Sequence, residues 1–207
     1  MIEVCVDTMA QALAAERQGA QRIELCARLD LDGLTPDRDF IQQALRDLSI
    51  PIHVMIRPRG GNFVYTAEEV EQMKADILFC KAAGAPGVVF GALRPDGSLD
   101  LPLIRELAEL ASPMNVVIHK AIDQTPDPVS ALKELLTLDP VNYVLTSGGA
   151  PTALEGTDKL KQMTALAGNA ITIIAAGKIT KDNLTHIRQV IGAKDYHGRL
   201  IVGTLEE

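Results

Sequence analysis

The string Arg57-Pro-Arg-Gly-Gly61 places two guanidinium groups two residues apart. Guanidinium groups bind carboxylate or phosphate through paired hydrogen bonds. Proline fixes the backbone between the two arginines, and the glycines leave the loop that follows flexible. This spacing predicts that Arg57 and Arg59 approach one small anion. The alternative is that both side chains lie on a solvated surface loop.

His119 is the sequence's candidate for a general acid or base, because imidazole exchanges protons near neutral pH. We expect Glu24 to be its partner. Asp123 follows four residues later and is expected either to orient a reacting group or to cap the next helix. Side chains alternate along a strand, so Lys120 is expected to point away from the site and not to form a Schiff base.

Two glycine-rich turns indicate a place for phosphate. Ser147, Gly148 and Gly149 follow one predicted strand, and Gly177 follows the next. Backbone N–H groups of such turns, near a helix N-terminus, can bind phosphate, although glycine-rich turns are common in β/α units. His197 is grouped with these residues as a substrate- or anion-binding candidate.

Cys5 and Cys26 are expected on the inward faces of adjacent strands, at similar heights. Two neighbouring thiolates suit a soft monovalent ion such as Cu(I). The alternative is that both are small buried side chains that pack as apolar groups. Cys80 is expected on a helix, with its side chain in the protein core. No HExxH motif or acidic cluster points to zinc or magnesium.

Short β-rich segments alternate with helical ones along the chain. The strands are predicted near residues 2–6, 22–27, 52–57, 87–91, 115–119, 142–146, 171–176 and 195–202, and the helices near 9–18, 36–48, 67–83, 101–110, 128–136, 153–166 and 180–190. This alternation predicts a parallel sheet with helical crossovers. Eight strands, with no GxGxxG in the first turn, favour a single TIM-type (β/α) barrel over residues 1–207 rather than an open doubly wound sheet.

Several helix ends carry sequence signals. Thr35 and Pro36 predict an N-cap with proline at the first helical position, and Thr66 with Glu69 predicts a capping box. Gly19 and Gly84 follow helices and suit the left-handed conformation of a helix C-terminus.

Strand periodicity predicts which side chains enter the barrel. The uniformly apolar faces must pack on the helices, so the mixed faces point inward. Their polar members are Glu3, Glu24, His53, Arg57 and His119. Buried charges need partners, so a Glu–Arg–His network is expected. Residues at the C-terminal ends of the strands form the site in this fold; the alternative is a network that only stabilises the barrel.

The predicted eighth strand is followed by too few residues for an eighth helix. We therefore expect an apolar strip beside the first and last strands, which a second subunit would cover in a homodimer or larger oligomer. A neighbouring helix shifted over the strip is the alternative.

Charge and composition limit the partners. The net charge of −7 argues against nucleic acid or an anionic membrane surface as the main partner, but not against a small anion in a local basic pocket. No apolar segment is long enough to span a membrane, and the N-terminus lacks a signal-peptide pattern. Three widely spaced cysteines favour a reducing, cytoplasmic location.

Seven short strings run in order across nearly the whole chain. They are Glu3-Val-Cys-Val-Asp7, Arg22-Ile-Glu-Leu-Cys26, Gly33-Leu-Thr-Pro36, Met55-Ile-Arg-Pro-Arg-Gly-Gly61, His119-Lys-Ala-Ile-Asp123, Leu145-Thr-Ser-Gly-Gly149 and Gly192-Ala-Lys-Asp-Tyr-His197. Together they resemble the CutC family, which is named for copper homeostasis. The resemblance implies a TIM-type barrel, a cytoplasmic location, a role in copper handling, and Cu(I) binding at Cys5 and Cys26. One departure is that the family's His-Arg-Ala-Phe-Asp has lysine and isoleucine here.

Two functional hypotheses follow. The first is a copper-homeostasis protein that binds Cu(I) at Cys5 and Cys26. The second is an enzyme acting on a small phosphorylated or carboxylated substrate, with Arg57, Arg59 and the Gly148–Gly149 turn as the anion site and His119 with Glu24 as acid and base. A scaffold that binds other proteins leaves the charged interior unexplained.

Overall fold

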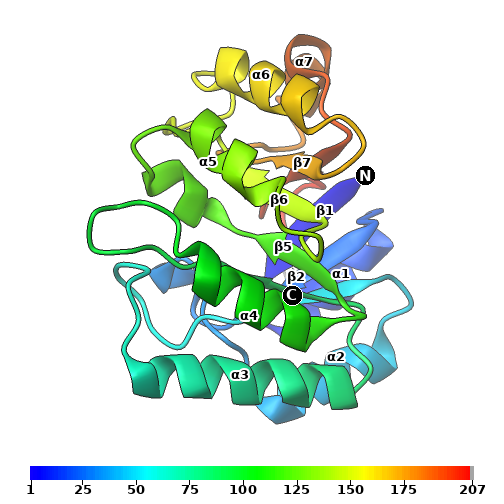
Figure 1. The fold of residues 1–207 in the computed structure, drawn as a ribbon. Helices are drawn as coiled ribbons and strands as arrows, with labels where there is room; N and C mark the ends of the chain where they lie inside the picture. The colour runs from blue at the N-terminus through cyan, green and yellow to red at the C-terminus, as the bar shows by residue number, and fades with distance from the viewer. Residues whose placement is uncertain (206–207) are drawn as a thin grey trace.

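Eight parallel strands close into a barrel in sequential order, and β8 pairs back to β1. Figure 1 shows strands such as β1, β5 and β6 inside the surrounding helices. The computed structural model describes residues 1–205. The strands are β1 Ile2–Val6, β2 Arg22–Leu25, β3 Ile52–Met55, β4 Gly87–Phe90, β5 Asn115–Ile118, β6 Tyr143–Thr146, β7 Thr172–Ala175 and β8 Asp195–His197. The predicted TIM-type barrel is confirmed. Most strands end one or two residues earlier than predicted, because the chain turns into a loop at the barrel mouth.

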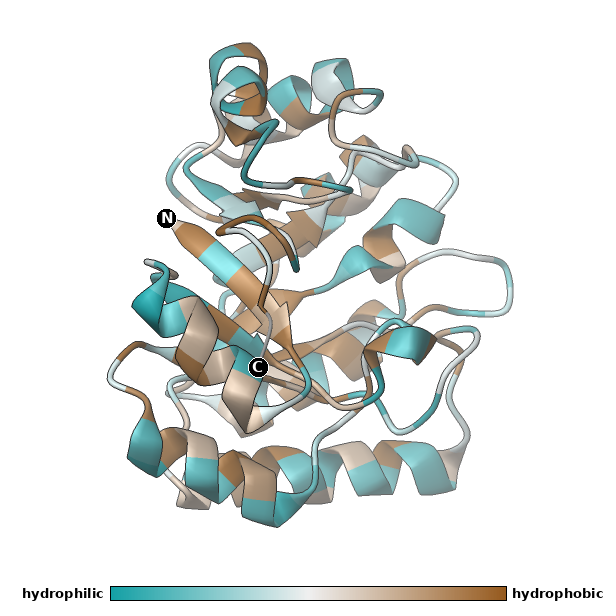
Figure 2. Cartoon of the chain, turned by 180° about the vertical axis from the view of Figure 1, so that it is seen from behind, coloured by the Kyte–Doolittle hydropathy of each residue, from teal (hydrophilic) through white to brown (hydrophobic). Residues whose placement is uncertain are grey.

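Seven α-helices surround the barrel within the described residues. They are α1 Met9–Arg17, α2 Arg38–Asp47, α3 Ala67–Ala82, α4 Leu101–Ala111, α5 Pro128–Leu135, α6 Thr157–Ala167 and α7 Leu184–Ile191. Apolar residues are concentrated on the strands, whereas polar and apolar residues alternate along helices such as α3 (Figure 2). This pattern places apolar helix faces on the sheet and polar faces in solvent.

The helix-end signals are largely confirmed. Thr66 and Glu69 form the predicted capping box of α3, and Gly19 and Gly84 have φ angles of 92° and 81°. The prediction for α2 is wrong. Asp37, and not Thr35, caps it by accepting a hydrogen bond from the Phe40 amide, so Pro36 lies before the cap.

The barrel separates two cores. The larger one lies between strands and helices and includes Val4, Val6 and Ile23. The smaller one fills the interior with Cys26, Met55, Val89, Val117, Leu145, Ile174 and Ala176. This division follows from the two-residue period of the strands.

Below the interior apolar layer lies a network of buried charges centred on Glu3. Arg22 forms an ion pair with Glu3 and another with Asp195, at 3.1 Å. His197 Nδ1 lies 2.8 Å from Glu3 Oε1, and His53 Nδ1 lies 3.8 Å from Glu3 Oε2. Burial raises the pKa of Glu3, but His197 and Arg22 outweigh it, so the pKa falls far below its usual range. The predicted Glu–Arg–His network is present, although Arg22, and not Arg57, supplies its guanidinium group.

The last strand is shorter than predicted. β8 ends at His197, and the chain turns at Gly198, where a Cβ atom would lie 2.3 Å from the Ile179 carbonyl oxygen. The following segment packs Ile201, Val202 and Leu205 into the main core, and Gln18 at the end of α1 donates to the Thr204 carbonyl. The C-terminal segment therefore covers the place where an exposed apolar strip was expected. Assembly into a dimer stays a prediction.

No helix among the described residues is long and apolar enough to cross a membrane.

Removing Arg22 should destabilise the barrel strongly. Arg22→Leu leaves the buried Glu3 carboxylate without its guanidinium partner, so we expect the free energy of unfolding to fall by about 3–5 kcal/mol. Urea denaturation measures this change. Arg28 is the matched control, because it pairs with Asp30 on the exposed surface, and Arg28→Leu should leave the urea midpoint nearly unchanged. Similar losses in both variants would contradict the network's role.

Substitutions at two neighbouring residues test whether the C-terminal segment covers the barrel. Ile201 is buried, whereas Leu200 is 45% exposed. We expect Ile201→Ala to lower the free energy of unfolding by about 2–4 kcal/mol, because it leaves a cavity in the core. Leu200→Ala should change it by less than about 0.5 kcal/mol. Equal effects in urea denaturation would show that this segment does not cover the barrel.

Candidate functional site

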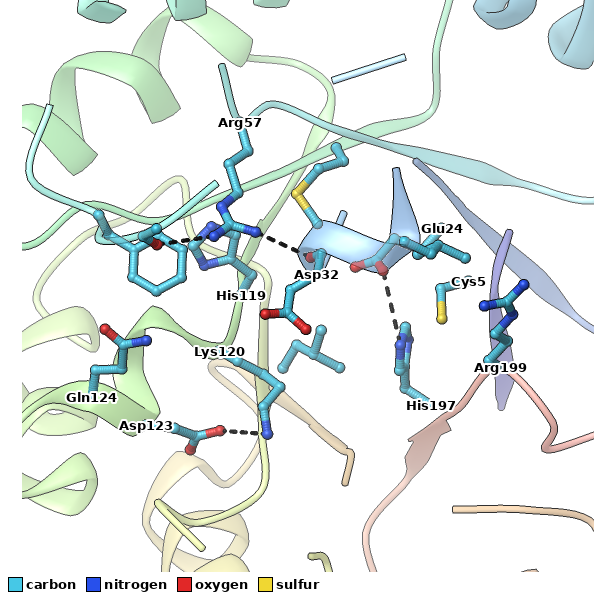
Figure 3. Close-up of a pocket in the computed structure, with 15 residues that line it drawn as sticks. Cys5, Glu24, Asp32, Arg57, His119, Lys120, Asp123, Gln124, His197 and Arg199 are labelled. Atoms are coloured by element: carbon cyan, nitrogen blue, oxygen red, sulfur yellow. Dashed lines mark hydrogen bonds and ion pairs between the residues drawn. The ribbon is translucent and has the colours of Figure 1, made fainter. Parts of the chain in front are cut away.

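A cavity of about 520 Å³ opens at the C-terminal ends of the strands (Figure 3). Its apolar walls include Leu29, Met55, Phe63 and Leu145. The titratable side chains that line it are Cys5, Glu24, Asp32, Arg57, His119, Lys120, Asp123, His197 and Arg199. A concave space of this size, with several convergent polar groups, is the usual form of a small-ligand site.

Cys5, Glu24 and His197 form a compact group on one side of the cavity. Each offers one ligand atom, and these three atoms lie within 4.8 Å of one another. Strand register brings them together, because Cys5 pairs with Glu24 and the preceding inward residue, Glu3, pairs with His197. The group therefore joins β1, β2 and β8, the first and last strands of the barrel.

His197 lies between two carboxylates. Its Nδ1 is bound to Glu3, and its Nε2 lies 3.8 Å from Glu24 Oε2 (Figure 3). Burial lowers the pKa of His197, but Cys5 and Glu24 outweigh this effect and raise the pKa well above its usual value. The anion-binding role of His197 stays a prediction, and the neighbouring carboxylates favour the protonated, cationic form of its own ring.

Glu24 is the buried carboxylate of this group. Burial raises its pKa to about 6, against the opposing effect of the nearby His197. Its Oε1 atom is buried and has no hydrogen-bond partner within residues 1–205, while its Oε2 faces His197 and the Cys26 thiol, at 3.8 and 3.7 Å. A buried unpartnered carboxylate oxygen is costly, so it is a candidate contact for a ligand.

Cys26 is completely buried in the interior apolar layer. Its pKa is raised well above the usual value, mainly by burial. The two thiols, expected at similar heights, are not direct partners in the strand register, because Cys5 pairs with Glu24 and Cys26 lies two residues farther along the chain. Cys26 is not a member of the compact group of Cys5, Glu24 and His197.

The two arginines do not converge on one point. Arg57 lines the cavity and donates to the carbonyls of Leu31, Asp32, Gly33 and Gly61. Arg59 pairs with Glu69 and donates to the Asn62 and Val64 carbonyls. Arg59 does not line the cavity, because the loop uses its guanidinium to hold its own shape.

His119 lines the cavity but does not pair with Glu24. Its Nδ1 accepts a hydrogen bond from the Ala121 amide, and its Nε2 has no partner in the described chain. Its ring packs 4.7 Å from the Phe63 ring and lies over Gly91, where a Cβ atom would be 2.7 Å away. Burial, reinforced by Arg57, lowers its pKa to about 3, so the ring is neutral at pH 7.

Asp123 holds the loop after β6. It accepts hydrogen bonds from the Ser147 and Gly149 amides and from the Thr146 hydroxyl, while Gly148 donates to the Thr146 hydroxyl. The amides predicted to bind phosphate are therefore already used within the protein. Gly177 does not line the cavity, and its carbonyl accepts a hydrogen bond from the Ala153 amide. Asp123 does not cap α5, whose cap is Asp127.

Lys120 lines the cavity, against the expectation from strand alternation. β5 ends at Ile118, and a 3₁₀-helix covers Lys120–Gln124, so the two-residue period no longer applies. Lys120 Nζ lies 2.7 Å from Ser147 Oγ and 3.2 Å from Asp123 Oδ2. These two groups direct the ammonium toward the barrel mouth.

Comparison with known proteins decides the family. A model described as the CutC family matches residues 1–202. The chain belongs to the CutC family. Relatives named copper homeostasis protein cutC homolog, from Mus musculus and Homo sapiens, are 46% and 45% identical over 197 residues, which are 95% of this chain and 72% of each relative. The resemblance found in the sequence is confirmed.

Solved structures agree with this assignment. A CutC structure from Streptococcus agalactiae has a TM-score of 0.91 and 30% identity, and covers 97% of this chain and 99% of that chain. A 2-keto 3-deoxygluconate aldolase from Picrophilus torridus has a TM-score of 0.64 at 14% identity, covering 95% of this chain and 73% of that chain. The aldolase shares the barrel fold alone.

Sequence reasoning missed part of this CutC-family site. Asp32 and Arg199 line the cavity from loops, and loop side chains have no fixed period that would show where they point. One feature of the sequence indicated that Glu24 and His197 could meet, because both residues fall on the inward faces of their strands. Their contact depends on closure of the barrel, which brings β8 beside β1.

The neutral, buried state of His119 predicts how stability depends on pH. The pKa of His119 is about 3 in the folded chain, against an ordinary value of 6.5. Between these two pH values the imidazole is protonated in the unfolded chain and neutral in the folded one. This contribution to stability is complete above pH 6.5 and is lost as the pH falls toward 3. His119→Asn removes it, and asparagine can still accept from the Ala121 amide.

Urea denaturation across pH should reveal this contribution. Between pH 6.5 and about 4.5, wild type should lose on the order of 2–3 kcal/mol more than His119→Asn. His186 is exposed on α7, and His186→Asn should follow wild type. Parallel curves for wild type and His119→Asn would show that His119 is not held neutral in the folded protein.

Proposed function

We propose that this chain takes part in copper homeostasis by binding Cu(I) at the group of Cys5, Glu24 and His197. The names of the curated relatives support the process. The proximity of the three ligand atoms supports the place. Copper is here the cargo of the protein.

The chemistry of Cys5 and His197 fits Cu(I), which favours thiolate and imidazole ligands. Glu3 holds His197 Nδ1. Because the pKa of His197 is raised, Nε2 becomes a ligand when the ring gives up its second proton, so Cu(I) binding releases a proton. A carboxylate that fixes the second nitrogen in this way is typical of metal-binding histidines.

Glu24 adds a carboxylate oxygen, which is a harder ligand than the thiolate and the imidazole and contributes mainly negative charge beside the ion. Its buried, unpartnered Oε1 gains a contact when a cation binds. Cys26, the second sulfur of the thiolate-pair hypothesis, donates to Glu24 Oε2 at 3.7 Å, so it helps to position this carboxylate. All three proposed ligands line the cavity, which gives the ion a path from the barrel mouth.

Cu(I) titration of the reduced, anaerobic protein against a competing chelator tests the proposal. We expect one tight site, with Cys5→Ser weakening it more than about a hundredfold and His197→Gln more than about tenfold. Cys26→Ser should weaken it by less than about tenfold. Cys80→Ser is the matched control, because Cys80 is a buried thiol in α3, and it should bind as wild type does.

Three outcomes are decisive. Retention of tight binding by Cys5→Ser would overturn the site. Loss in Cys26→Ser as large as in Cys5→Ser would replace the proposed group by the thiolate pair. Equal loss in Cys80→Ser would mean that the change comes from the fold.

An enzyme acting on a small phosphorylated or carboxylated substrate is the second candidate. The cationic side chains that line the cavity, Arg57, Lys120 and Arg199, favour an anionic substrate. Its predicted acid–base pair needs revision, because Glu24 lies with His197 and His119 stands apart. Arg57 and not Arg59 would contact such a substrate.

A further inference from the structure

Arg57 is a buried cation without an anionic partner. It is 4% exposed, and no carboxylate of the described chain forms an ion pair with it, whereas Arg22 has two such partners. Its Nη atoms donate only to backbone carbonyls, and its Nε has no acceptor. A buried charge normally has a counter-charge. Asp32 and Asp123 also line the cavity, but neither forms an ion pair with Arg57, so its guanidinium is left without one.

His119 presents a second unused donor nearby. Nδ1 accepts from the Ala121 amide, so it carries no proton. In a neutral imidazole the proton then lies on Nε2, which is buried and without an acceptor among residues 1–205. Arg57 acts on the pKa of His119, and both side chains contact the Phe63 ring, at 4.9 and 4.7 Å.

Lys120 adds a third donor on the same cavity. Its ammonium can donate three hydrogen bonds, and Ser147 and Asp123 take two. Figure 3 shows Arg57, His119 and Lys120 around the cavity, on the side away from Cys5 and His197. Phe63 and Leu145 beside them offer apolar surface for a short carbon chain.

We propose that this side of the cavity binds a small organic anion, whose carboxylate or phosphate oxygens accept hydrogen bonds from Arg57, His119 and Lys120. The anion supplies the missing counter-charge of Arg57 and the missing acceptor of His119. This inference goes beyond copper binding and does not rest on it, because none of its three donors belongs to the proposed copper group.

Metal-free protein and two probes test the proposal. Calorimetric titrations use malonate for the carboxylate and inorganic phosphate for the phosphate, with ionic strength held constant by NaCl. We expect saturable binding of at least one probe. His119→Asn should raise its Kd by about tenfold or more, and Lys120→Met by about threefold. Lys161→Met is the charge-matched control on the exposed face of α6 and should stay within about twofold of wild type.

The outcomes separate the possibilities. Binding of malonate alone assigns a carboxylate, and binding of phosphate alone assigns a phosphate. Binding of neither, or an unchanged Kd in both His119→Asn and Lys120→Met, overturns the proposal. Circular dichroism establishes that His119→Asn folds; if it does not, Lys120→Met carries the test. Because copper is absent, failure here leaves the Cu(I) titration unaffected, and failure of that titration leaves this one unaffected.

Discussion

The Glu3 carboxylate imposes the constraint on which the rest of the interior depends. It is buried inside a closed barrel, where an unpaired charge is very costly. Arg22 from the neighbouring strand and His197 from the last strand compensate it, and Asp195 balances Arg22 from the other side. These contacts join β1, β2 and β8, the strands that complete the closure. Charge compensation and barrel closure therefore depend on each other.

This constraint also positions the candidate site. Because Glu3 holds one nitrogen of His197, the other nitrogen faces Glu24 and the cavity. Cys5 follows Glu3 on the same face of β1 and reaches the same place. A network that stabilises the lower barrel thus presents a thiol, an imidazole and a carboxylate at the floor of the cavity. The lower end of the charged interior therefore has a structural role, and its upper end forms the candidate site.

Around the mouth, the chain uses many of its own charges to shape the loops. Asp123 occupies the amides of the β6 loop, and Arg59 ties its loop to Glu69 and nearby carbonyls. Such groups resemble ligand-binding residues in the sequence, because the same hydrogen-bonding capacity serves either purpose. Arg57 and His119 differ from them, since each keeps a buried donor unused.

The sequence by itself determined the alternating β/α order, the inward faces of the strands and the membership of Glu3, Cys5, Glu24 and His119 in the interior, because period and residue type are local properties. It also determined the family through short motifs. Only the tertiary structure decided which inward residues meet. His197 joins Glu3 through β8–β1 pairing, Cys26 lies beyond Cys5 through strand register, and Lys120 enters the cavity where β5 has ended. Register, closure and loop direction arise from contacts between distant segments, which no local pattern encodes.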